Sequence, residues 1–271
     1  LRRTRRQRSL SPMPAHSRSI GGQGSQRPLH ARRVVAVDVA RGLAIAGVVL
    51  FHIVWDLEFT GMIRGVAQHP VWLLFGRSLA GTFVFLVGVS LVLAHHDTIQ
   101  IFPFIRRLLT IALCAAAITV ATWFAFPEAF IYFGILHAIA AASLLGLLFL
   151  RAGALVCLAA AVIVLILPLF VDLAAFNTRW LAWTGFAELT PPSNDFVPIF
   201  PWFGVTLLGM ASAKLFLLRR DQNSPADSQV QAWHIRLLVW MGHWSLLIYL
   251  VHQPILLSII VPLSWMVSPQ G

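Results

Sequence analysis

The first long apolar segment of this chain carries ionisable side chains on one helical face. Arg41 and His52 are eleven residues apart, so an α-helix brings them within about 20° of one another and about 16 Å apart along its axis. Asp38 and Asp56 fall on the same stripe. The segment is long enough to cross a bilayer, which accepts buried charges only where they have partners or a function. The stripe therefore predicts either a polar seam between helices or a catalytic or ion-conducting face.

The composition of the chain indicates a membrane protein. Of its 271 residues 58% are hydrophobic and 11% charged, with a mean hydropathy of +0.80, which excludes an ordinary water-soluble domain. Nine of the 20 Lys and Arg residues lie in positions 1–33, where they favour a topology signal and anionic-lipid contacts over nucleic-acid binding. We expect a disordered basic tail over 1–33 and a transmembrane domain over 34–265.

Seven apolar segments predict an all-α, polytopic membrane helical bundle. They lie near residues 34–54, 72–94, 105–126, 130–150, 153–172, 198–218 and 237–261. Pro254 predicts a bend in the last segment. In a seven-span arrangement one side collects most basic loop residues, which are Arg106, Arg107, Arg151, Lys214, Arg219, Arg220 and Arg236. The positive-inside rule then puts the N-terminus in the cytoplasm and the C-terminus outside.

This orientation brings polar residues of five predicted helices to a similar depth. The residues are His52, Arg77, His137, Asp195 with Trp202, and His252. Their agreement in depth predicts a shared polar cavity that opens toward the outer face. Cys114 and Cys157 lie inside apolar segments and indicate neither a disulfide nor a metal site, and His95-His96-Asp97 lacks further ligands nearby, so we expect no metal.

Several motifs resemble a known family. The matching blocks are 38–42 (Asp-Val-Ala-Arg-Gly), 51–52 (Phe-His), 81–90, 133–137 (Phe-Gly-Ile-Leu-His), 196–204 with its Pro-Trp-Phe-Gly, and 242–254 with its Tyr-Leu-Val-His-Gln-Pro. In this order they are similar to the bacterial DUF1624 proteins, which belong with the heparan-alpha-glucosaminide N-acetyltransferase catalytic-domain family in the transmembrane acyltransferase group. The blocks cover nearly all of the predicted membrane domain.

The resemblance implies transfer of an acyl group, acetyl above all, from cytoplasmic acyl-CoA to an amine or hydroxyl, often on a sugar, at the outer face. It also implies that His52 is the catalytic residue and that the chain lies in a bacterial cytoplasmic (inner) membrane. His52 suits a general base or an acyl-accepting nucleophile. Asp56 would either orient this imidazole or be a solvated loop acid. Self-association is left open.

Two arginines are candidates for the acyl donor. Arg41 suits a phosphate or the thioester oxygen of acyl-CoA, because its guanidinium stays charged when buried. Its alternative is a structural pair with Asp38. Arg77 would contact an anionic ligand or pair with an outer acid such as Asp195.

The remaining candidates come from the fourth, sixth and seventh segments. His137 is either a hydrogen-bonded pocket residue or a second base. Ser245, Tyr249 and His252 recur at i, i+4 and i+7 and form one polar stripe, with a role in the site or in helix–helix bonding. Trp202 would stack on a sugar ring or anchor its helix at the membrane–water interface. Gly81 and Gly88 favour close helix contact.

A second class of function fits the same intramembrane residues. A small transporter or proton-coupled permease also needs His, Arg and Asp side chains along its path. The sequence lacks the inverted repeat and paired broken helices that many such proteins contain.

Overall fold

A computed structural model describes residues 35–95, 98, 100–219 and 232–267. The predicted tail at 1–33, Val34, and His96 and Asp97 of the expected loop lie outside these residues. The described part is all-helical and contains no strand, which confirms the fold class in its coarse form.

Five helices are long and apolar enough to cross a membrane. They are α1 (Val35–Phe59), α2 (Pro70–Ala94), α3 (Ile101–Ala125), α7 (Ile199–Arg219) and α9 (Ser245–Val267). Two shorter apolar helices are α4 (Ile135–Gly146), extended by η3 (Leu147–Phe149), and α5 (Ala154–Ile166), extended by η4 (Leu167–Leu169). The other elements are η2 (Pro127–Ala129), η5 (Ala174–Phe176), α6 (Arg179–Ala182) and α8 (Trp233–His243). The chain is therefore a multi-pass membrane protein.

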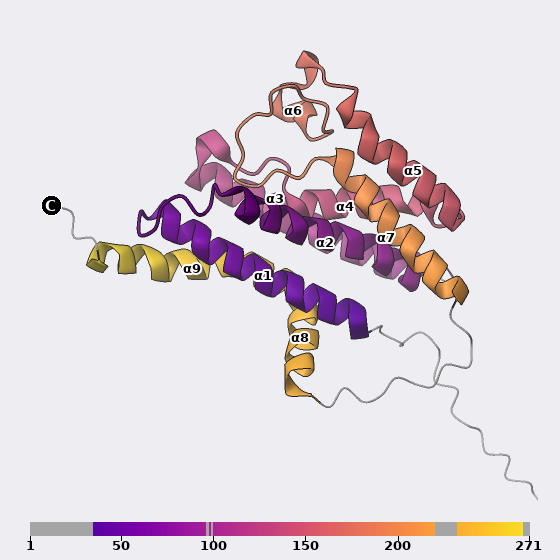
Figure 1. Cartoon of the computed structure of the whole chain (residues 1–271), viewed down its shortest axis with the longest axis horizontal. Coiled ribbons are helices and arrows are strands. Elements are labelled where there is room, and N and C mark those ends of the chain that lie inside the picture. Colours follow the sequence, from indigo (N-terminus) through magenta and orange to yellow (C-terminus); the bar gives the residue numbers. More distant parts are fainter. Residues whose placement is uncertain (1–34, 96–97, 99, 220–231, 268–271) are drawn as a thin grey trace, which may run out of the picture. The chain divides into compact units, whose positions relative to one another are not determined.

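The helices pack in two linked sets. α7 packs against α2 and α5, while α1 packs against α8, α9 and α2 (Figure 1). Backbones approach closely where α2 meets α7, because a Cβ on Gly88 would meet the carbonyl oxygen of Thr206. The Thr206 hydroxyl donates a 3.0 Å hydrogen bond to the carbonyl of Val84 at the same crossing. Small residues thus allow the close helix contact expected at Gly88.

The last predicted segment, 237–261, differs from the structure, which has two helices there. α8 ends at His243, α9 begins at Ser245, and α8 runs across the direction of α9 (Figure 1). A Cβ on Gly242 would meet the carbonyl oxygen of Asp38 on α1, so this close contact fixes the direction of α8. The helix continues through Pro254, and a break lies at Trp244, where none was predicted.

This break changes the position of His252 along its helix. It lies seven residues after Ser245, a rise of about 10 Å into α9. The predicted segment began too early, yet the ring of His252 still lies beside that of His52 on α1, the residue expected at the same depth.

Candidate active site

Two histidines meet where α1 and α9 lie side by side. The ring centroids of His52 and His252 are 4.6 Å apart, with the rings at 75°. Each Nδ1 contacts a carbonyl of its own helix, Val48 at 2.9 Å and Tyr249 at 2.6 Å. A carbonyl oxygen only accepts, so each Nδ1 donates and each Nε2 keeps its lone pair. Both imidazoles can therefore receive a proton at Nε2.

A second contact joins the same helices beside the histidines. Gln253 Nε2 donates a 2.7 Å hydrogen bond to Oδ1 of Asp56, which is only 1% exposed. Asp56 Oδ2, Gln253 Oε1 and His252 Nε2 are buried without a hydrogen-bond partner among the described residues. Buried polar atoms in proteins are nearly always paired, with protein, water or ligand. This cluster therefore points to a ligand or water in contact with it.

The position of Asp56 differs from one sequence expectation. Asp56 bonds to α9, whereas the Nδ1 of His52 bonds to its own helix. Within the described residues no hydrogen bond joins Asp56 to His52, and the acid is buried, which also excludes the solvated-loop alternative. Gln253 was not among the sequence candidates, although it directly follows His252 in the last matching block.

Tyr249 connects the histidine pair to Asp195. The Asp195 carboxylate accepts from the backbone amide of Ile135 at 2.8 Å and from the Tyr249 hydroxyl at 3.4 Å. Burial raises the pKa of the Asp195 carboxyl, and these two hydrogen bonds partly oppose the rise. The carboxylate thus holds the N-terminus of α4 against α9.

Arg77 lies away from this arrangement. It is exposed on α2, and within the described residues it forms no ion pair with Asp195. Arg77 was predicted to contact an anionic ligand, but among the described residues no other candidate site residue lies beside it to share that contact.

His137 occupies a separate hydrogen-bonded position. Its Nδ1 accepts from the Gly134 amide at 3.2 Å, and its Nε2 lies 3.2 Å from the Thr119 hydroxyl, which donates to the Ile131 carbonyl. Both ring nitrogens are occupied, so the geometry fits the hydrogen-bonded pocket role and not the second base.

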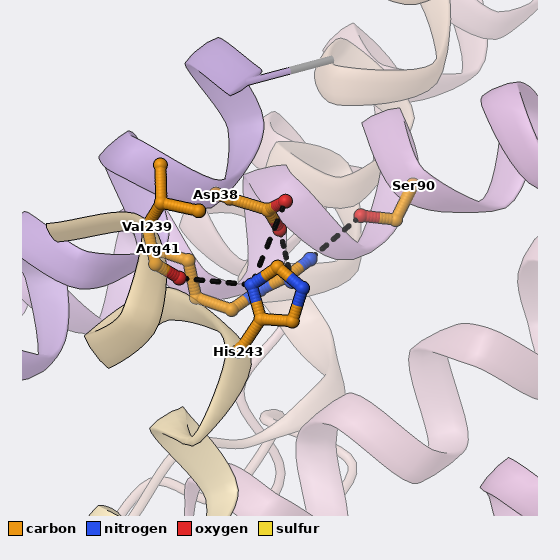
Figure 2. A network of polar contacts seen from close by, with 5 residues as sticks. All are labelled: Asp38, Arg41, Ser90, Val239 and His243. Atoms are coloured by element: carbon orange, nitrogen blue, oxygen red, sulfur yellow. Dashed lines mark hydrogen bonds and ion pairs between the residues drawn. The ribbon is translucent and has the colours of Figure 1, made fainter. Parts of the chain in front are cut away.

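A polar network joins the beginning of α1 to α2 and α8. Figure 2 shows Arg41 between Asp38, at 3.4 Å, and the Ser90 hydroxyl, at 3.0 Å. The Nδ1 of His243 lies 3.9 Å from the other Asp38 oxygen and 2.9 Å from the Val239 carbonyl. The predicted Arg41–Asp38 pair is present.

A cavity of about 540 Å³ leads from this network toward the histidines. Arg41, Arg106 and Arg107 line it, together with His243, Ser245 and Tyr249. Sequence reasoning treated Arg106 and Arg107 only as topology signals. Most of the remaining wall is apolar. Trp202 is partly buried and packs against a buried cluster that includes Ile135, which also lines the cavity, so its side chain lies in the bundle near the cavity wall.

The fold and site define a multi-pass membrane protein with two contacting histidines, of which His252 is buried, and an arginine-lined cavity. Residues 33–254 match the family model described as heparan-alpha-glucosaminide N-acetyltransferase, catalytic. The chain belongs to this family, which confirms the resemblance and indicates a membrane acetyltransferase with acetyl-CoA as the general donor of the family. Comparisons with curated proteins and with solved structures gave no match.

Proposed function

We propose that the chain transfers an acyl group, acetyl in the first instance, from cytoplasmic acyl-CoA to a sugar amine or hydroxyl at the outer face. One observation carries this proposal. The arginine-lined cavity extends to Tyr249, whose ring lies 5.5 Å from that of His252. A donor bound in the cavity would thus present its thioester beside the histidine pair.

The arginines suit the nucleotide end of the donor. Acyl-CoA carries a diphosphate and a 3′-phosphate, and guanidinium groups bind phosphates through paired, charge-assisted hydrogen bonds. Arg41 lies early in α1, and Arg106 and Arg107 lie early in α3. In the seven-span arrangement, in which α4 and α5 also cross, both places face the cytoplasm. The apolar remainder of the cavity suits the pantetheine arm and the acyl chain.

The histidine pair suits the transfer step. As the acceptor nitrogen or oxygen attacks the thioester carbonyl, the Nε2 lone pair of His52 takes its proton. The C–S bond then breaks, and the thiolate of CoA leaves and receives that proton. In the two-step alternative, His52 Nε2 forms the new bond to the acyl carbon, CoA leaves, and the acceptor then takes the acyl group from the imidazole. His252 would assist as a neighbouring base.

The unpartnered atoms around Asp56 suit the acceptor. A carboxylate oxygen, an amide oxygen and an imidazole lone pair all accept hydrogen bonds. Such a cluster favours a group that brings protons, as an amine or a sugar hydroxyl does, and it lies beside the pair that would remove one of them. Asp56, Gln253 and His252 would thus orient the attacking group.

Purified protein in lipid nanodiscs tests this function. With radiolabelled acetyl-CoA and a panel of amino sugars and polyols, we expect labelled product from the native chain and at least about a hundredfold slower labelling with His52→Ala. His234→Ala, at an exposed histidine of α8 outside the cavity, is the matched control. Full turnover by a folded His52→Ala protein would reject the role of His52. Substrate uptake into proteoliposomes that contain no acyl-CoA would favour a permease instead.

A further inference from the structure

One face of α8 exposes a stripe of large apolar side chains. Trp233, Leu237, Trp240 and the following Trp244 are 75%, 46%, 55% and 50% exposed. Their spacing of four, three and four residues places them on one helical face. Three tryptophans on one short stripe are unusual on a surface that faces water.

The other face of α8 is held by α1. A Cβ on Gly42 would meet the carbonyl of Leu238, and a Cβ on Gly242 would meet the carbonyl of Asp38. Because the two backbones touch there, α8 has a fixed rotation about its axis. The tryptophan stripe consequently points away from α1.

The length of α9 places α8 at a membrane surface. With 23 residues, α9 is about 34 Å long, so it spans the whole hydrocarbon core, which is roughly 30 Å thick. α8 ends directly before α9 and runs across its direction (Figure 1). With 11 residues, α8 is about 16 Å long and too short to cross the core. It therefore lies where α9 enters the bilayer.

We propose that α8 is an interfacial helix that binds the lipid headgroup layer of the membrane that α9 spans. Tryptophan prefers this layer, because its ring is apolar and its N–H can hydrogen-bond to headgroups. Exposed Arg236, next to Leu237, would contact a lipid phosphate, and α8 contains no Asp or Glu to oppose an anionic lipid. This combination matches the composition of helices that lie in the membrane plane. The proposal does not depend on acyl transfer.

Spin labels test the position of the stripe in the full chain. In a variant lacking Cys114 and Cys157, labels at L237C and W240C in nanodiscs should meet oxygen more readily than a water-soluble nickel chelate. A label at exposed Leu113 of α3 gives the lipid reference, and one at exposed Arg151 the water reference. Nickel accessibility equal to that at Arg151 would overturn the proposal. Shielding from both reagents would also overturn it, because a protein partner or a second copy would then cover the stripe.

Amide hydrogen exchange tests whether α8 binds anionic lipid headgroups in preference to neutral ones. Exchange across residues 233–243 should slow about fivefold when anionic lipid replaces neutral lipid in the nanodisc, and R236Q should remove most of that difference. The matched variant R151Q, at an exposed arginine outside α8, should keep it. Equal exchange rates of the native chain in both lipids would contradict the phosphate contact of Arg236.

Discussion

The imidazoles of His52 and His252 meet edge to face across the α1–α9 contact, with their centroids 4.6 Å apart. Each ring is held by a backbone carbonyl at Nδ1, so both present Nε2 as the free base. A proton taken by one ring could be shared with its neighbour. Such a pair is expected to act as one unit.

A double-mutant cycle tests this unit. We expect His52→Ala to lower kcat/KM by about 10² to 10⁴, the usual contribution of a general base. Residues that act together are strongly non-additive, so adding His252→Ala should lower it by no more than a further factor of about three. Losses that multiply in the double variant would show two independent roles.

The arginine end of the cavity predicts a donor-specific defect. Arg107→Gln should raise the KM for acetyl-CoA about tenfold, because one charge-assisted hydrogen bond to a phosphate is lost. kcat should change little, since the proposed transfer takes place beyond Tyr249, at the histidine pair. Arg151→Gln removes an exposed arginine outside the cavity and should leave KM unchanged. An equal rise in both variants would point to general surface charge.

The Asp56–Gln253 contact predicts a stability cycle. Gln253→Leu leaves the buried Asp56 carboxylate without its amide donor and should lower the free energy of unfolding by about 1–3 kcal/mol. Replacing both residues by leucine removes the unpaired group as well, so much of that loss should be recovered. Thermal unfolding in one detergent measures the stability of both variants. A double variant less stable than Gln253→Leu would contradict this account.

Apolar length predicted most of the helices, but not the end of the bundle. α1, α2, α3 and α7 follow from long apolar segments, because each must satisfy its backbone within the membrane. The break between α8 and α9 depends on Gly242 packing against the Asp38 carbonyl. That tertiary contact has no local signal in an apolar run.

The site was predictable in its depth and less so in its contacts. Helical spacing placed Tyr249 and His252 on one stripe, and the structure joins them to Asp195 and His52. Spacing gives the depth of Arg77 but not the direction in which α2 turns it, and it is exposed. Arg107 resembled a topology signal because a basic residue at a helix end fits either a topology signal or an anion-binding role.

Asp195 predicts a pH dependence of stability. Its pKa is raised by burial in the folded protein, so the folded state binds its proton more tightly than the unfolded state. Stability should therefore fall as pH rises through that pKa. Asp195→Asn keeps an acceptor for the Ile135 amide but does not titrate. Thermal unfolding from about pH 4 to about pH 8 should show the native chain losing stability relative to this variant. A relative gain with pH would mean that the hydrogen bonds outweigh burial.

Two glycines of α2 give a matched test of the packing that supports the site. A Cβ on Gly88 would meet backbone atoms of Thr206 on α7, whereas on Gly81 it would meet only a ring carbon of Trp202 at 3.5 Å. Backbone cannot move aside as a side chain can, so Gly88→Ala should cost about 1–3 kcal/mol of stability. Gly81→Ala makes an ordinary contact and should change stability little. Thermal unfolding of both variants in one detergent compares them directly. Equal losses would show that α2 tolerates no added side chain on this face, whatever it meets.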